Sequence, residues 1–245
     1  MGFFNLFKKE EIQTLAKLKV DMHSHILPAL DDGSSNLVDS QILVERLIEH
    51  GYEKLIATPH IMFNFYDNSK DTILPALEKL RLKCKELNHK IEIEAAAEYY
   101  LDEGLINKLS NNEDLLCFGP NKYVLFETSY MNESSIYNQA VFMMKSNGYS
   151  PVLAHPERYI YAYPDFKIYE KMFERGALFQ ININSLSGYY SEGAKVMAEK
   201  LIDRKMVHFA GTDCHKIKHI ETLSKSLKSK HFNKLLDLPL LNRTL

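Results

Sequence analysis

Short groups of histidine and acidic residues recur along the sequence, and imidazole and carboxylate side chains are common ligands of divalent metal ions. In chain order the groups are Asp21-Met-His23-Ser-His25, Thr58-Pro-His60, Glu98, Glu127, His155-Pro-Glu-Arg158, Asn182 and Asp213-Cys-His215. A single histidine of this kind more often makes a structural hydrogen bond than binds a metal. Because five of the ten histidines fall in these groups, we expect the set to form one metal site.

The segments that must position these groups follow a βα pattern. Short apolar segments alternate with longer segments of helical period, which is typical of parallel strands connected by helices. Seven strands are predicted, at residues 19–21, 54–58, 91–96, 123–127, 151–154, 178–183 and 207–210. The carboxyl ends of such strands meet at one edge of an open sheet or at one mouth of a closed barrel. The histidine and acidic groups lie at these ends, so we expect them to converge in space.

The spacing within the first and last groups suits metal binding. In Asp21-x-His23-x-His25 the period of two puts the three side chains on one face of an extended segment, so two imidazoles can hold one ion. Asp213-x-His215 repeats this spacing, and Cys214 between them is expected to point away and pack. Imidazole and carboxylate without thiolate favour Mn²⁺, Fe or Zn²⁺ over Mg²⁺. The histidines outside the groups are expected to be ordinary surface or loop residues: His50, His89, His208, His219 and His231.

Length and composition exclude several classes of protein. A chain of 245 residues suits one large α/β domain and is short for two, so we expect a single domain over residues 1–245. A net charge of −2 provides no basic field, so nucleic acid is not an expected partner. Cys84, Cys117 and Cys214 form no C-x-x-C pair, which favours a reducing cytoplasm over a disulfide framework or zinc ribbon. No apolar run approaches the ~20 residues of a membrane helix.

Residues 1–17 are expected to form an N-terminal arm. Phe3, Phe4, Leu6 and Phe7 make it apolar, and its charges follow the apolar stretch, unlike those of a signal peptide. We expect the arm to pack on its own domain; the alternative is a contact with a membrane or a partner.

Taken in order, the motifs resemble those of the polymerase-and-histidinol-phosphatase (PHP) superfamily over about residues 18–220. Within it, Asp31-Asp32-Gly33 and His155-Pro-Glu-Arg158 are similar to the bacterial capsule-biosynthesis protein-tyrosine phosphatases. The resemblance implies an α/β fold, a distorted (β/α)7 TIM-like barrel, with a site for two or three divalent ions. Mn²⁺ is the expected cofactor, with Fe, Zn²⁺, Co²⁺ or Mg²⁺ as alternatives.

The resemblance also assigns ligands to each ion. The first ion would be held by His23, His25, Glu98 and Asp213, the second by Glu98, Glu127 and His155, and the third by Asp32, His60 and His215. Glu98 would bridge two ions. By motif position Asp32 is preferred to Asp31, and Glu98 is preferred to Glu94 because Glu94 lies within the predicted strand at residues 91–96.

The expected catalytic residues are Arg158, His60 and Asp213. Arg158 would clamp a phosphate oxygen, with an ion pair to Glu157 as the alternative. Lys216 and Tyr99 are expected to contact the substrate. Members of the phosphatase group commonly carry a second arginine several residues after Asp-x-His, and the stretch that follows here, Lys216-Ile-Lys218-His219, has none; Lys216, Lys218 or His219 could supply positive charge instead.

The activity implied by the resemblance is removal of phosphate from phosphotyrosine, with the tail of a bacterial tyrosine kinase as substrate. A phenol leaving group suits such a site, since its pKa near ~10 makes it better than an alkoxide. A slot for the ring could be walled by aromatic residues near the strand ends, although loop packing explains each of them: Phe63, Phe65, Tyr66, Tyr99, Tyr100, Tyr159, Tyr161 and Tyr163.

Two other functions remain open from the sequence. A histidinol-phosphate or other small-molecule phosphatase would share the metal ligands, and a non-catalytic metal-binding assembly module would use the metals for stability alone. A cysteine nucleophile is excluded, because none of the three cysteines is followed by arginine in a C-x5-R loop.

Overall fold

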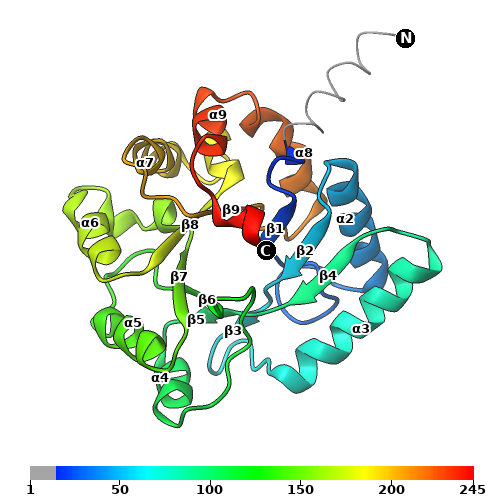
Figure 1. The fold of residues 1–245 in the computed structure, drawn as a ribbon, viewed down its shortest axis with the longest axis horizontal. Coiled ribbons are helices and arrows are strands. Elements are labelled where there is room, and N and C mark those ends of the chain that lie inside the picture. Colours follow the sequence, from blue (N-terminus) through cyan, green and yellow to red (C-terminus); the bar gives the residue numbers. More distant parts are fainter. Residues whose placement is uncertain (1–14) are drawn as a thin grey trace.

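The computed structural model describes residues 15–245 and has a strand at each of the seven predicted positions (Figure 1). The strands are β1 Val20–Ser24, β2 Lys54–Ala57, β3 His60–Ile61, β4 Glu92–Ala95, β5 Glu98–Tyr100, β6 Tyr123–Glu127, β7 Ser150–Ala154, β8 Leu178–Asn182 and β9 Phe209–Gly211. His60 and Glu98 therefore lie within short strands of their own instead of after β2 and β4. The apolar part of the N-terminal arm, with its expected contacts, lies outside the described residues.

Helices follow most of the strands and surround them in Figure 1. They are α2 Leu37–Glu49, α3 Lys70–Glu86, α4 Glu103–Ser110, α5 Tyr137–Ser146, α6 Lys167–Glu174, α7 Glu192–Asp203, α8 Ile217–Ser226 and α9 Lys230–Leu236. Four short 3-10 helices also occur: η1 Pro156–Arg158, η2 Ile160–Ala162, η3 Ile183–Ser187 and η4 Leu241–Thr244. None of the helices in residues 15–245 combines the length and the apolar character needed to cross a membrane.

The strands pair in parallel in two sheets, ordered β1-β2-β4 and β3-β5-β6-β7-β8-β9. The sheets are joined because β2 bends into β3 and β4 bends into β5. Hydrogen bonds continue across these bends, from Ala96 N to Ala57 O (2.8 Å) and from Glu98 N to Pro59 O (3.1 Å).

The last strand returns to the first. Asp213 N donates to His23 O (2.8 Å), His25 N donates to Cys214 O (2.9 Å), and Ser24 forms a parallel bridge with Cys214. If each bent pair counts as one strand, seven strands form a ring, as expected for a distorted (β/α)7 barrel.

Side chains alternate between the inside of the ring and the helices outside it. In β6, Tyr123 and Leu125 belong to the inner apolar cluster, whereas Val124 and Phe126 pack in the outer one. The same alternation continues the inner face to Glu127, the last residue of β6. The apolar interior of the ring therefore ends in acidic and histidine side chains at the carboxyl mouth.

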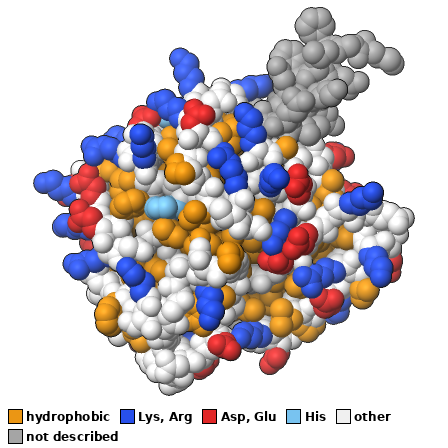
Figure 2. All heavy atoms as spheres, viewed as in Figure 1, with side chains coloured by type: hydrophobic (Ala, Val, Ile, Leu, Met, Phe, Trp, Pro, Cys, Tyr) orange, Lys and Arg blue, Asp and Glu red, His pale blue; other side chains and the backbone are white. Residues whose placement is uncertain are grey.

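The opposite end of the ring is covered by η4, and the C-terminus lies beside β1 and β9 (Figure 1). Leu241 and Leu245 pack against the inner cluster. On the same face, Figure 2 shows hydrophobic side chains gathered near the middle and acidic and basic ones interspersed around them. Asn242, fully buried, donates to Val20 O (3.0 Å) and Ala210 O (2.8 Å) and accepts from Ala210 N (3.0 Å).

Asn242→Ala should lower the free energy of unfolding by about 2–4 kcal/mol, because it leaves buried peptide groups of β1 and β9 without partners. Urea denaturation followed by circular dichroism measures this loss. The exposed Asn233→Ala is the control and should change stability by less than about 0.5 kcal/mol. Equal stabilities of the two variants would contradict the role given to Asn242.

Candidate metal centre

The nine predicted metal ligands meet at the carboxyl mouth of the ring, around a pocket of about 330 Å³. Four groups of them have donor atoms within 4.8 Å of one another. The groups are His23, His25 and Glu98; His60, Glu98 and Glu127; His23, His155 and Asp213; and His25, Asp32, His60 and His215. Residues up to 192 positions apart in the sequence, such as His23 and His215, thus share one site.

Glu98 lies at the centre of the cluster. Its Oε2 is 3.2 Å from His23 Nε2, 3.3 Å from His25 Nε2 and 3.3 Å from His60 Nδ1. Its Oε1 is 3.0 Å from His155 Nε2. One carboxylate therefore presents its two oxygens to two separate sets of imidazoles, which is the arrangement that a bridging ligand requires.

Asp213 and Glu127 lie on either side of this centre. Asp213 Oδ1 is 3.4 Å from His23 Nε2 and 3.5 Å from His25 Nε2. Glu127 Oε1 is 3.4 Å from His60 Nδ1, and its Oε2 is 3.7 Å from His155 Nε2. Both carboxylates are buried, so each closes one end of the inner part of the cluster.

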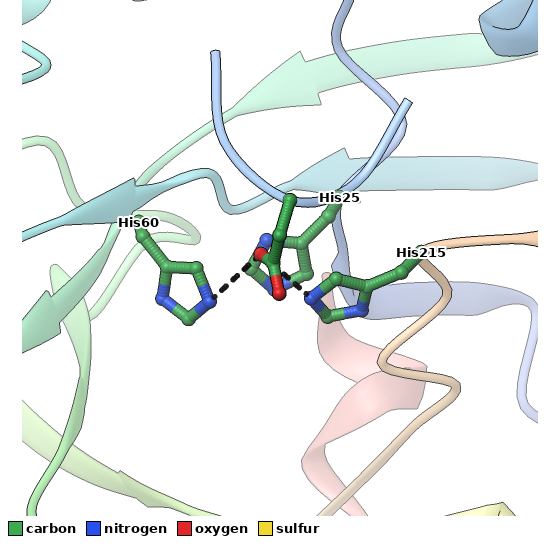
Figure 3. A group of neighbouring side chains, drawn as sticks. His25, His60 and His215 are labelled. Atoms are coloured by element: carbon green, nitrogen blue, oxygen red, sulfur yellow. Dashed lines mark ion pairs between the residues drawn. The ribbon is translucent and has the colours of Figure 1, made fainter. Parts of the chain in front are cut away.

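The group of His25, Asp32, His60 and His215 is the one that reaches the solvent. His25, His60 and His215 approach one another in Figure 3, and Asp32 Oδ1 lies 3.6 Å from His60 Nε2 and 3.4 Å from His215 Nε2. The side chain of Asp32 is 55% exposed, unlike the inner carboxylates. This group is therefore the outer end of the site.

Asp31 supports the cluster from outside. Its carboxylate accepts from His25 Nδ1 (2.7 Å), Gly33 N (2.9 Å) and His60 N (3.0 Å). Gly33 is required here, because a Cβ would collide with the carbonyl oxygen and the Cβ of His25. The tight Asp31-Asp32-Gly33 loop thereby fixes His25 with one aspartate and directs the other to His60 and His215.

The tautomers of three histidines fit metal binding. His23 Nδ1 pairs with Gln180 Oε1 (2.9 Å), His25 Nδ1 with Asp31 Oδ2 (2.7 Å) and His215 Nδ1 with Asp213 O (3.0 Å). Each acceptor holds the ring proton on Nδ1 and leaves the Nε2 lone pair directed into the cluster. A nitrogen and oxygen donor set oriented in this way fits divalent cations such as Mn²⁺, Fe²⁺ or Zn²⁺.

The electrostatics also favour cations. Burial, together with the nearby Glu98 carboxylate, raises the pKa of Glu127 well above its usual range. Burial would also raise the pKa of Asp213, but the imidazoles of His23 and His215 lower it well below the usual value. Burial would lower the pKa of His23, yet Glu98 and Asp213 raise it to about 9. Several buried carboxylates thus compete for limited positive charge, and bound cations would satisfy them.

Local backbone irregularities aim some of these side chains. Alternation along β7 puts Ala154 in the inner cluster and would point His155 outward, but His155 adopts a left-handed conformation (φ 32°). Asp213 is also left-handed (φ 51°), and β1 shifts register against β2 between Asp21 and Ser24. Non-glycine residues in such conformations cluster at functional sites.

Arg158 forms one wall of the pocket. Its Nη1 donates to Asp213 Oδ2 (3.1 Å), and its guanidinium lies between the rings of Tyr130 and Tyr190. The alternative ion pair with Glu157 is absent. Glu157 is buried and instead accepts from Asn182 N (2.9 Å) and Ser185 Oγ (2.6 Å).

Comparisons with known proteins identify the family of this chain. The sequence model of the family described as "Capsular polysaccharide synthesis, CpsB/CapC" matches residues 19–231. The chain belongs to this family. Among its curated relatives, the tyrosine-protein phosphatase YwqE of Bacillus subtilis is 28% identical over 199 residues, covering 81% of this chain and 78% of YwqE. The tyrosine-protein phosphatase CpsB of Streptococcus pneumoniae is 25% identical, covering 81% and 83%.

Solved structures of the CpsB/CapC family and of a more distant phosphatase share the fold. The match to the crystal structures of YwqE and CpsB, described as unique metal-dependent tyrosine phosphatases, has a TM-score of 0.76 at 25% identity and covers 91% of this chain and 94% of the other. Histidinol phosphate phosphatase from Lactococcus lactis matches with a TM-score of 0.51 at 18% identity, covering 86% and 92%. The resemblance found in the sequence is therefore confirmed for the family and for the fold.

Tyr99 was expected to contact the substrate, but it does not line the pocket. Its ring is 3% exposed in the outer core, and its hydroxyl accepts from Leu116 N (2.8 Å). Tyr159 is likewise buried in the outer core, and Phe63 and Phe65 are exposed side chains that do not line the pocket. The expected substrate contact of Tyr99 is therefore wrong, because the residue after Glu98 in a strand points to the opposite face.

Two residues near the missing second arginine do line the pocket, Lys216 and His219, whereas Lys218 does not. The expectation that His219 is an ordinary surface or loop histidine is therefore wrong. Its Nδ1 accepts from the backbone N–H groups of His215 and Lys216, both at 3.1 Å. Burial lowers the pKa of His219 to about 4, so its ring is neutral at pH 7.

Sequence reasoning missed Tyr130, Tyr190, Gln180 and the supporting role of Asp31. Tyr130 follows Glu127 by three residues, and Gln180 lies two residues before Asn182. Both are therefore close to strand ends that the sequence predicts. Tyr190 lies in the loop between η3 and α7, far from any motif. Nothing in its local sequence signals that it reaches the pocket.

Glu127→Gln should stabilise the metal-free protein. A charged Glu127 is repelled by the buried Glu98 carboxylate, and a neutral Glu127 must take up a proton; both lower the free energy of unfolding. In EDTA at pH 7 we expect a gain of about 1–3 kcal/mol in unfolding free energy. Because the pKa of Glu127 is raised in the folded state, the wild-type protein loses stability as pH rises above the usual glutamate pKa of 4.5. The variant lacks this loss, so its gain over wild type should grow with pH in this range.

The same variant should gain less than the wild type from added Mn²⁺, because one donor is weakened. Thermal melts with EDTA and with Mn²⁺ measure both effects, and the exposed Glu174→Gln serves as the control. A variant that is less stable than wild type in EDTA and responds to Mn²⁺ as wild type does would be incompatible with this view of Glu127.

Proposed function

We propose that this protein is a metal-dependent protein-tyrosine phosphatase that removes phosphate from phosphotyrosine of a bacterial tyrosine kinase in capsule or exopolysaccharide synthesis. The observation that carries the proposal is the convergence of nine nitrogen and oxygen donors and Arg158 on one pocket. Membership of the CpsB/CapC family and the names of the relatives support the same activity. A kinase substrate would place the enzyme in the cytoplasm.

The four donor groups support two or three ions, with Mn²⁺ as the proposed metal. By the family resemblance the inner ions would be held by His23, His25, Glu98 and Asp213 and by Glu98, Glu127 and His155, and the outer one by Asp32, His60 and His215. His155 lies near both glutamates of the second set, and His60 is also grouped with them. Divalent ions bound there supply positive charge for phosphoryl oxygens and lower the pKa of water toward neutrality.

Arg158 gives the pocket a fixed cation for the phosphoryl group. Its side chain is 23% exposed and lines the pocket, so its remaining N–H groups can donate to phosphate oxygens. Asp213 holds this guanidinium through Oδ2 and faces the imidazoles through Oδ1. Asp213 thus contacts both Arg158, where the phosphoryl group would bind, and the histidine ligands of the metal centre.

His60 and Lys216 complete the proposed catalytic surface. His60 lies between the inner and outer donor groups, with Nδ1 toward Glu98 and Nε2 toward Asp32. Lys216 adds a second positive charge at the rim, where a lysine can serve as a point charge but not as a bidentate clamp. A tyrosine leaving group needs little proton donation, because its phenol has a pKa near ~10.

A cysteine nucleophile has no support in the structure. Cys84 and Cys214 are buried, and none of the three cysteines lines the pocket. Burial raises the pKa of Cys214 well above its usual value, which disfavours the thiolate that nucleophilic attack requires.

The direct test is hydrolysis by the metal-loaded protein. We expect turnover of p-nitrophenyl phosphate and phosphotyrosine peptides, loss of activity in EDTA and recovery with Mn²⁺, measured by phosphate release. His23→Ala should lower kcat/KM by at least about 100-fold, whereas His231→Ala, in α9, should not change it.

The other candidate functions give different results in the same assay. Faster turnover of histidinol phosphate than of phosphotyrosine peptides would overturn the substrate class. A folded, Mn²⁺-loaded wild type that hydrolyses none of these substrates would favour the non-catalytic assembly module.

Arg158→Lys tests the phosphate clamp separately from the metal site. We expect kcat/KM for p-nitrophenyl phosphate to fall about 10- to 100-fold, because lysine keeps the charge but loses the planar pair of donors. Metal content, measured by elemental analysis, should stay at the wild-type value. Unchanged kinetics would remove Arg158 from the proposed mechanism.

A further inference from the structure

The guanidinium of Arg158 lies against two tyrosine rings. Its central carbon lies 4.6 Å from the ring centroid of Tyr130 and 4.3 Å from that of Tyr190. An arginine side chain has many rotamers, and a cation held between two aromatic faces loses most of them. The two ring contacts therefore restrict the positions that the guanidinium can take.

The two tyrosines are themselves tied to the metal ligands. Tyr130 Oη donates to Glu127 Oε2 (3.0 Å), and Tyr190 Oη donates to Asp213 Oδ2 (3.3 Å). Asp213 Oδ2 also accepts from Arg158 Nη1 (3.1 Å) and Asn182 Nδ2 (2.7 Å). The orientation of the guanidinium plane is therefore set by carboxylates of the metal centre on both sides.

One edge of the guanidinium is used by Asp213, and the side chain still lines the pocket. A guanidinium with one nitrogen bonded to Asp213 and two rings packed against it can present its remaining N–H groups to the pocket in a restricted set of directions. Preorganised donors of this kind favour a bound phosphoryl group, because no rotamer entropy is lost when it arrives.

We infer that Tyr130 and Tyr190 are positioning residues, which hold Arg158 between their rings so that its free edge receives the phosphoryl group of the substrate. This inference rests on the proposed function. The tyrosines act through Arg158 and not as a slot for the substrate ring, since each gives one ring face to the guanidinium. Tyr130 also packs against the rings of His155 and Tyr159, and Tyr190 against those of Tyr189 and His219.

Binding of inorganic phosphate to the Mn²⁺-loaded protein tests this, because phosphate has no aromatic ring and needs no turnover. Tyr130→Leu and Tyr190→Leu should each weaken phosphate binding about tenfold, measured by calorimetry and by competitive inhibition. Tyr130→Phe and Tyr190→Phe keep the rings and should weaken it by about threefold or less. The manganese content of all four variants should match that of the wild type.

A double-mutant cycle separates positioning from direct contact. In an Arg158→Ala background, either leucine substitution should change phosphate affinity by less than about twofold, because the residue it orients is gone. Tyr149→Leu, a partly buried tyrosine next to the amino end of β7, is the matched control and should have no effect in either background.

If the tenfold loss of phosphate affinity persists in the Arg158→Ala background, the tyrosines contact phosphate themselves. If the leucine variants bind phosphate as wild type does while Arg158 is present, the tyrosines do not position Arg158. Either result overturns the inference. If a leucine variant does not fold, Tyr130→Gln or Tyr190→Gln, which also lack the ring, are measured in the same way. Phosphate binding without hydrolysis of any phosphoester would reject the proposed function and leave this inference standing.

Discussion

The structure depends on one buried carboxylate, that of Glu98, being kept within 3.3 Å of four imidazoles. A charge in that position is stable only if opposite charge or metal ions accompany it, so its neighbours cannot be exchanged freely. His23 comes from β1 and His60 from β3, whereas His25 and His155 directly follow β1 and β7. The ring of parallel strands brings these distant segments together around the Glu98 carboxylate.

Around this centre, hydrogen bonds from neighbouring residues orient several of the ligands, among them His23 and His25, whereas His155 Nδ1 is buried without a hydrogen-bond partner. Gln180 orients His23 and also accepts from His155 N (3.2 Å), so one amide ties together two ligands from β1 and β7. Asp31 does the same for His25 and the backbone of His60. Buried networks of this kind preorganise a site, because their polar groups are satisfied only in one arrangement. Several donors are therefore held in place by their neighbours, and Asp32, with 55% of its side chain exposed, is the donor that faces the solvent.

Much of the fold and of the donor set could be predicted, because alternating apolar segments imply parallel strands and parallel strands bring their ends together. The strand positions and the convergence of the strand-end donors followed from that rule, whereas Asp32 was assigned by the family resemblance. The supporting residues could not be predicted equally well. Tyr190 reaches the pocket from a loop, and His219 reaches it because it lies one helical turn after His215. Tyr99 was misplaced because Glu98 was expected after a strand, whereas it lies within one and directs its neighbour outward.

Closure of the ring through β1 and β9 has a consequence for biosynthesis. β1 is made long before β9, since Asp213 bonds to His23 and Asn242 bonds to Val20 across 190 and 222 residues of sequence. Until those residues leave the ribosome, one edge of β1 has no strand beside it, and exposed edges of this kind recruit other chains. The nascent protein should therefore depend on chaperones late in translation, and its folding should be slow for its size because the decisive contacts are so distant in sequence.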